Sequence, residues 1–245
     1  MTLTLRGIWL IARRELGAYF NTTWGYGVVA ALLLLEGLAF NAYALTDRPR
    51  LSTEVLETFF FLASGFTLTA GVLLTLRLFA EERQLGTSLL LEGAPLPTGA
   101  VVAGKFLSAF LFVLMMLALS TYMPALILVN GKVSLGHVFA GYLGLAAIGA
   151  CAVAIGAFTS SLTRSQVVAG ILGGVIVVLF LLWWKVARVS DPPLKEIFSY
   201  LSLFDRHFRP FMEGRVSSAG LVYYASVAGA FLFATTRTLQ WRRWR

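Results

Sequence analysis

Six runs of apolar residues dominate this sequence, and each is about 20 residues long or longer. An α-helix needs about 20 apolar residues to cross the roughly 30 Å hydrocarbon core of a bilayer. The apolar residues are gathered in these runs and are not spread through short strands and amphipathic helices. Because a helix satisfies its backbone hydrogen bonds within one segment, we predict an all-α integral membrane protein with six transmembrane helices.

The predicted spans leave two polar segments that are long enough to carry function. The spans lie at roughly residues 25–45, 56–78, 104–129, 138–160, 167–187 and 218–236. Pro124 is expected to interrupt the third span, because proline removes a backbone donor. The polar segments lie between the second and third spans and at 188–217, the longest predicted loop. Residues 24–245 are therefore expected to form one six-helix transmembrane domain.

Composition agrees with a membrane protein. Hydrophobic residues make up 58% of the chain and charged residues 13%, whereas soluble domains carry about 25% charged residues. The net charge of +8 would suggest nucleic acid as a partner of a soluble protein. Here the basic residues flank apolar spans, where they fix orientation, so we predict a membrane-lipid environment and no nucleic-acid partner.

Residues 1–23 are predicted to form an amphipathic helix that lies in the membrane interface. Apolar residues recur at helical spacing, and the arginines fall mostly on the other side of the wheel. The first span is too long for a signal-peptide core and is expected to act as an uncleaved anchor.

The distribution of Lys and Arg predicts that both termini are cytoplasmic. With the N-terminus inside, the inner segments hold eleven basic residues, and the two short outer loops hold three, namely Arg48, Arg50 and Lys132. Residues 185–217 hold the other six, offset by four acidic residues. Short loops carry most of the orientation signal.

Glu36 is the only charged residue inside the first predicted span. An ionised carboxylate in lipid costs a few kcal/mol, so the side chain should face protein or water. Two interpretations stay open: a group on a substrate or proton path, and a carboxylate paired within the bundle.

The polar segment after the second span carries the clearest motif. Arg77–Gly86 reads RLFAEERQLG, which suits a short helix with charged residues on one side and apolar residues left for packing. Together with the following Leu91, Pro95 and Gly104-Lys105-Phe106, the segment Arg77–Thr87 resembles the cytoplasmic motif of ABC-2 type transporter permeases, in particular those of the gliding-motility-type branch. The segment Leu201–Phe208, followed by Phe211, Gly214 and Leu221–Tyr224, is similar to the last extracellular segment of that branch.

The resemblance implies a permease subunit in the bacterial cytoplasmic (inner) membrane that dimerises with a second copy or a paralogue. It also implies a separate cytoplasmic ATP-binding subunit that contacts this chain through a coupling helix. The residues expected to couple to that ATPase are Arg77, Phe79, Glu81, Glu82, Arg83, Gly86 and Thr87, with polar contacts from Glu81, Glu82 and Arg83.

No enzymatic activity is predicted for the chain itself. The sequence lacks a Gly-x-x-x-x-Gly-Lys-Ser/Thr phosphate loop. We therefore expect no cofactor bound by this chain, and ATP and Mg bound by the partner ATPase. A membrane-embedded lipid-modifying enzyme is the weakest alternative, because the spans hold no histidine and, apart from Glu57 at the edge of the second span, one carboxylate.

The long loop holds the remaining candidates, Asp205, His207 and Phe208, as an extracellular cover of the bundle mouth. His137 and His207 are the only histidines, and their spacing matches no metal site, so no metal is predicted. An alternative function uses this loop to pass ATPase motion to periplasmic partners without moving cargo. The sequence does not select a substrate or a direction of transport.

Overall fold

The computed structural model describes residues 2–44, 51–86, 96–130, 133–192 and 194–243. Every regular element in these ranges is a helix. In chain order the elements are α1 (Thr2–Asn21), α2 (Thr23–Ala39), a π-helical turn η1 (Phe40–Ala44), α3 (Ser52–Thr75), α4 (Arg77–Gln84), α6 (Thr98–Ser120), α7 (Tyr122–Asn130), α8 (Leu135–Leu162), α9 (Gln166–Val189), α10 (Leu194–Leu201), α11 (Arg209–Met212) and α12 (Ser218–Arg243).

Six candidate membrane spans are found among these described residues, which confirms the predicted fold class. They are Thr23–Tyr43, Ser52–Gln84, Thr98–Val129, Leu135–Leu162, Gln166–Val189 and Ser218–Arg242. The predicted spans overlap all six, but the second, third and sixth helices extend up to six residues beyond them. The third begins at Thr98, six residues before the predicted 104, because Pro97 serves as its N-cap and its carbonyl accepts the amide of Ala100 at 2.8 Å.

The third span is interrupted as predicted, but the break lies a few residues before Pro124. α6 ends at Ser120 and α7 begins at Tyr122. Proline cannot donate to the carbonyl four residues before it, so the break falls on that preceding turn. The Ser120 hydroxyl donates to the Leu117 carbonyl of its own helix at 2.9 Å and lies 3.1 Å from the Tyr142 hydroxyl of α8.

α8 is the centre of the bundle. It packs against α3, α12, α9 and α6 and also contacts α4 and α11. Small residues let these helices approach closely, as expected for membrane helices. A Cβ on Gly141 would lie 2.1 Å from the Phe60 ring, and one on Gly156 would lie 1.8 Å from the Thr75 hydroxyl.

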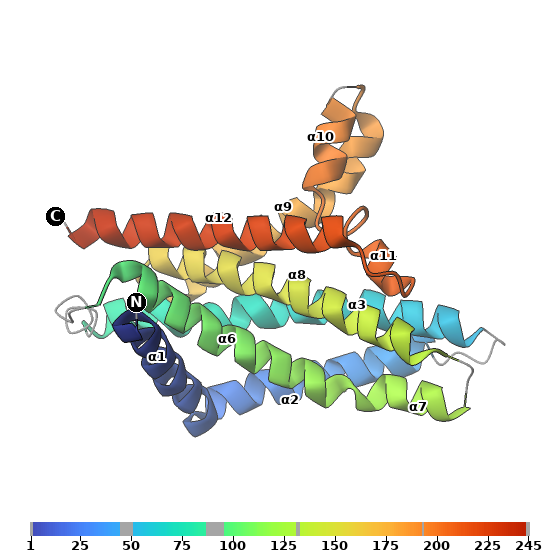
Figure 1. Cartoon of the computed structure of the whole chain (residues 1–245), viewed down its shortest axis with the longest axis horizontal. Helices are drawn as coiled ribbons and strands as arrows, with labels where there is room; N and C mark the ends of the chain where they lie inside the picture. The colour runs from blue at the N-terminus through green and yellow to red at the C-terminus, as the bar shows by residue number, and fades with distance from the viewer. Residues whose placement is uncertain (1, 45–50, 87–95, 131–132, 193, 244–245) are drawn as a thin grey trace.

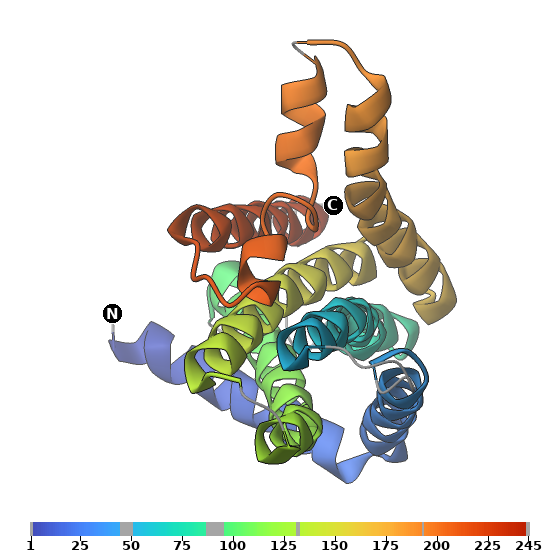
Figure 2. The same ribbon diagram turned by 90° about the vertical axis from the view of Figure 1, so that its right-hand side faces the viewer.

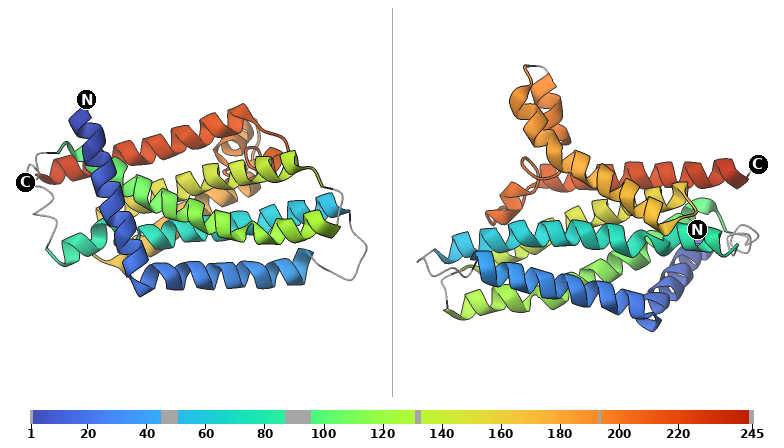
Figure 3. Two further views of the ribbon diagram at one scale, coloured as in Figure 1. Left: turned by 60° about the horizontal axis from the view of Figure 1, so that its bottom comes forward. Right: turned by 180° about the vertical axis from the view of Figure 1, so that it is seen from behind.

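Both termini lie at the same end of the bundle (Figure 1). We call this the terminal end; it holds α1, α4, the start of α6, the end of α8 and the end of α12. The opposite end holds α7, the start of α8 and α11. The N-terminal helix α1 runs obliquely across the bundle at the terminal end and meets α2 at a sharp corner (Figure 3).

The predicted loop 188–217 is partly helical, so describing it as a loop was incomplete. α9 continues to Val189, and α10 turns back along it, with the Trp183 and Phe198 rings stacked at 4.9 Å. Seen along the bundle, α10 and the end of α9 project away from the other helices, whereas the first part of α9 packs against α8 (Figure 2). Within the same segment, the only helix described after α10 is the single turn α11, from Arg209 to Met212.

Candidate functional site

The second span is divided into α3 and α4 by a side chain from α8. Ser160 Oγ accepts the amides of Phe79 and Ala80, each at 3.1 Å, and donates to the Leu76 carbonyl at 3.0 Å. In an uninterrupted helix these amides would bond to carbonyls one turn earlier. A hydroxyl inserted into that ladder bends a helix. Ser160 therefore sets α4 at its own angle and ties its first turn to the centre of the bundle.

Lys105 makes the second set of contacts that hold α4 in place. Its side chain is 1% exposed, although it is a lysine in a membrane helix. Nζ donates to the Leu78 carbonyl at 2.7 Å and to Glu82 Oε1 at 2.8 Å, and it lies 5.3 Å from the centre of the Phe79 ring. A buried ammonium is stable only where it is paired and hydrogen-bonded, and α4 supplies both kinds of partner.

Helix α1 completes the environment of this lysine. Glu15 Oε1 lies 3.4 Å from Lys105 Nζ. The carboxylate comes this close because Gly104 lets α1 cross α6: a Cβ there would lie 2.8 Å from Cβ of Ile11. Arg14 pairs with Glu15 and lies 3.6 Å from Glu82, and the hydrogen bond with Glu15 raises the pKa of Arg14. The result is a four-residue ionic clamp, formed by Arg14, Glu15, Glu82 and Lys105, that joins α1, α4 and α6.

The other charged residues of α4 also bond within the chain. Arg77 forms an ion pair with Glu81 one turn later, and Arg83 donates to the Ser161 carbonyl. The exposed part of this segment is its end, Gln84–Gly86, where Leu85 is 68% exposed and Gly86 adopts a left-handed φ of 73°. Thr87, together with Leu91 and Pro95 of the motif, lies outside the described residues.

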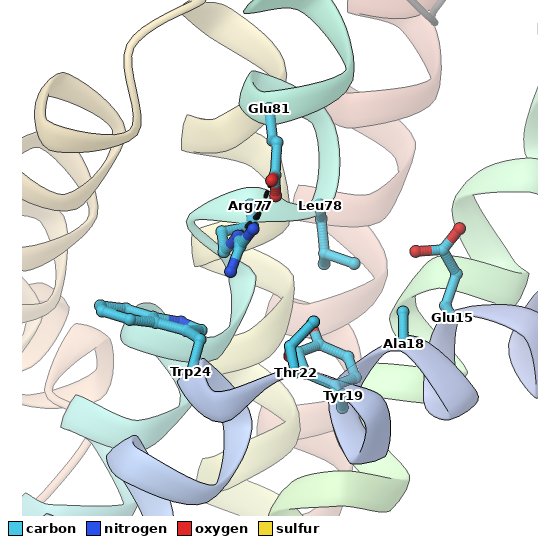
Figure 4. Close-up of a pocket in the computed structure, with 8 residues that line it drawn as sticks. All are labelled: Glu15, Ala18, Tyr19, Thr22, Trp24, Arg77, Leu78 and Glu81. Atoms are coloured by element: carbon cyan, nitrogen blue, oxygen red, sulfur yellow. Dashed lines mark hydrogen bonds and ion pairs between the residues drawn. The ribbon is translucent and has the colours of Figure 1, made fainter. Parts of the chain in front are cut away.

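A cavity of about 200 Å³ separates α1 from α4. Figure 4 shows Arg77 and Glu81 of α4 on one side, and Tyr19, Thr22 and Trp24 at the α1–α2 corner on the other. The Tyr19 hydroxyl donates to the Leu74 carbonyl at 2.8 Å, and burial raises the pKa of this phenol far above its ordinary value. The phenol therefore acts as a permanent donor that holds the corner against α3.

Glu36 lies inside the bundle and far from the clamp in sequence. Its side chain is 1% exposed, and its Oε1 has no hydrogen-bond partner among the described residues. The next residue, Gly37, faces the start of α7: a Cβ there would lie 3.2 Å from the Tyr122 hydroxyl oxygen. The carboxyl group thus faces protein and not lipid, next to the break between α6 and α7 and one turn before η1.

The candidate residues of the long loop lie at the opposite end and differ in burial. Phe208 and His207 are buried, whereas Asp205 is exposed. The His207 ring stacks on Tyr223 at 3.8 Å and its Nε2 bonds to the Tyr200 carbonyl at 3.0 Å. Among the described residues, no three His, Cys, Asp or Glu side chains gather as a metal site would require.

Sequence reasoning did not assign roles to Lys105, Ser160 or Glu15. Lys105 was seen only as part of a motif that opens the third span. One feature of the sequence does indicate its role: a lysine at the start of an apolar run needs an acidic partner. Ser160 gave no such signal, because serine is common in membrane helices and its partners lie about 80 residues away in the chain.

Comparison with known families gives one match. A family model described as ABC-2 family transporter protein matches residues 9–205. The matched range includes all four residues of the ionic clamp and Ser160. No curated protein matches the chain.

Proposed function

This chain belongs to the ABC-2 family of transporter proteins, and we propose that it is a permease subunit driven by a separate cytoplasmic ATPase. The main support for this proposal is the attachment of α4 to the bundle. Lys105 joins it to α6, and Ser160 joins it to α8. A short helix with this attachment is suited to receive motion at its exposed end and to pass it into two central helices.

The proposal includes the finer features that the sequence motif implies. We propose that the terminal end faces the cytoplasm, that two copies or two paralogues assemble in a bacterial inner membrane, and that the chain belongs to the gliding-motility-type branch. ATP and Mg would be bound by the partner subunit, and the pair would export a substrate that is not yet identified.

The structure changes which residues of α4 should be tested as ATPase contacts. Glu82 is part of the ionic clamp and Glu81 is paired with Arg77. Reversing either charge would disturb the permease itself as well as any partner. Leu85 is exposed at the end of α4 and is the better probe of a docking surface.

The test is co-purification of the tagged permease with an ATPase subunit carrying a phosphate loop, encoded beside it. We expect Leu85→Asp to reduce the recovered ATPase by about tenfold, since loss of a buried leucine contact is worth about 1.5–3 kcal/mol. Val216→Asp, at the opposite end and 56% exposed, is the control and should leave recovery unchanged. Recovery of a stable permease without ATPase, and equal recovery with both variants, would contradict the proposal.

A second candidate function is the transmission of ATPase motion to periplasmic partners. The α9–α10 hairpin favours it, because α10 and the end of α9 project from the bundle and carry exposed apolar residues such as Val189 (89%) and Leu194 (53%). Reconstituted vesicles separate the two functions. ATP-dependent accumulation of cargo supports transport, whereas ATP hydrolysis that depends on a periplasmic partner and moves no cargo supports transmission.

A further inference from the structure

A groove runs along the last turns of α12 at the terminal end. It encloses about 490 Å³. The residues that line it are Ala234, Arg237, Thr238, Trp241 and Arg242. Their spacing of three and four places them on one face of the helix. The groove is separate from the ionic clamp and from the cavity between α1 and α4.

The groove is positively charged. In the described part of the chain, neither Arg237 nor Arg242 forms an ion pair with a carboxylate. Arg237 stacks over the Phe233 ring at 4.9 Å, and Arg242 donates one hydrogen bond of 2.8 Å to the Leu162 carbonyl. A guanidinium group has five donors, so most of them have no partner among the described residues.

The neighbouring sequence does not compensate this charge. Residues 230–243 contain no Asp or Glu. The Leu162 contact brings the turn between α8 and α9 alongside, and residues 160–170 contain no acid either but add Arg164. A ligand that carries negative charge is therefore the one that the groove favours.

The depth of the groove matches a lipid headgroup. It lies at the end of the candidate span Ser218–Arg242, and Trp241 is 79% exposed there. Tryptophan concentrates at the level of the headgroups, where its ring packs on apolar chains and its N–H meets polar groups. α12 also lies at the periphery of the bundle. In its apolar stretch 28% of the residues are buried in the protein, compared with 61% in the apolar stretch of α8.

We propose that this groove binds the phosphate of an anionic phospholipid. The guanidinium groups of Arg237 and Arg242 hold the phosphate oxygens through charge-assisted hydrogen bonds. Trp241 packs along the first part of the lipid chains. The proposal is independent of the ATPase, of the orientation of the chain and of the identity of the substrate.

The test uses the full-length chain purified in detergent and titrated with phosphatidylglycerol. Bound lipid is counted by native mass spectrometry, and the melting temperature is followed in parallel. Each arginine near an anionic lipid contributes about 1 kcal/mol. We therefore expect Arg237→Gln/Arg242→Gln to weaken binding about 25-fold. The control is Arg6→Gln/Arg13→Gln, which removes the same charge from exposed residues of α1 at the same end and should have little effect.

A second measurement does not depend on removing the arginines. Phosphatidylglycerol brominated near the headgroup should quench the fluorescence of the wild-type chain, and Trp241→Phe should reduce that quenching. Equal weakening by both arginine pairs would mean that only the overall charge matters, and would overturn the site. Equal binding of phosphatidylcholine, or unchanged quenching in Trp241→Phe, would overturn it as well.

Discussion

The two ends of the bundle are fastened by different chemistry. At the terminal end, α1 and α4 are held to α6 by one buried ammonium group, Lys105, and its carboxylate partners Glu15 and Glu82. At the opposite end, the buried contacts of the segment before α12 are made by uncharged groups, and its ion pairs, from Glu213 to Arg209 and Arg215, involve exposed arginines. The Tyr223 and Tyr224 hydroxyls donate to the Leu201 and Leu203 carbonyls at 2.7 and 2.6 Å.

The difference lies in how the stabilisation is distributed. A buried ion pair concentrates it in a few atoms, and removing one partner leaves the other without compensation. Neutral hydrogen bonds and packed rings spread it over many contacts, each worth about 1 kcal/mol. The stability of the terminal end therefore depends on a few charged atoms, whereas that of the opposite end is shared among many neutral contacts.

The largest effect is expected from Lys105→Met, which keeps the length of the side chain and removes its charge. Glu82 and Glu15 then lose their ammonium partner, and the Leu78 carbonyl loses its donor. Because these carboxylates are 20% and 16% exposed and can reach water, the loss should be near the lower end of the usual range, about 3 kcal/mol. The measurement is thermal or denaturant unfolding in detergent.

The double variant Lys105→Met/Glu82→Gln tests whether charge is the reason. It removes both partners of the closest pair and should recover part of the lost free energy of unfolding. If the double variant is as destabilised as the sum of the two single variants, the clamp contributes through packing alone and the contrast between the two ends disappears.

A smaller effect is expected at the opposite end from Gly144→Ala. The new Cβ would lie 2.6 Å from Cβ and 2.8 Å from Cγ of Phe211, a fully buried residue of α11. These atoms are close to the backbone, so the methyl group displaces α11 and not just a ring. Such overpacking costs about 1–3 kcal/mol, measurable by the same unfolding assay.

Gly174→Ala is the matched control for this change. No atom lies within 4 Å of a Cβ built at Gly174 in α9, so alanine should be neutral or slightly stabilising through helix propensity. A larger loss from Gly174→Ala than from Gly144→Ala would show that the opposite end does not depend on the fit of Phe211.

Apolar run length was enough to predict the six spans, because crossing a bilayer fixes the length and hydrophobicity of a helix. The amphipathic helix over 1–23 also has a counterpart in α1. Its apolar side, however, is divided in the structure: Ala12 and Tyr19 are buried, whereas Leu5 and Trp9 are more than half exposed. A helical wheel cannot distinguish apolar residues that face the bundle from those that face away from it.

The candidate site was less predictable than the fold. The motif located α4, but it indicated Glu81, Glu82 and Arg83 as contacts of a partner, and all three bond within this chain. The partners of Glu82 and Arg83 come from α6 and α8, which local spacing does not bring together. Glu81 pairs with Arg77 one turn earlier in α4 itself. The orientation residues Arg48, Arg50 and Lys132 lie outside the described residues, so the cytoplasmic placement of the termini stays a prediction.

The smallest effect that we expect is a pH dependence of local stability. It should differ between the two ends, because both histidines of the chain lie at the opposite end. Burial lowers the pKa of His207, and the charge of Arg206 lowers it further, against the hydrogen bond to Tyr200. Folding therefore favours the neutral ring. This contribution to stability is complete above the unfolded pKa of about 6.5 and is lost as pH falls below it.

We expect amide hydrogen exchange, corrected for its intrinsic pH dependence, to speed up in residues 201–212 between about pH 7.5 and about pH 5.5. Residues 77–84 of α4 should change less over that interval, because no histidine lies there. His207→Gln keeps a donor for the Tyr200 carbonyl without titrating, so it should flatten the response, whereas His137→Gln should leave the response of residues 201–208 in place. If α4 loosens as much as residues 201–212, or if His207→Gln leaves the response intact, the acid sensitivity does not originate at His207.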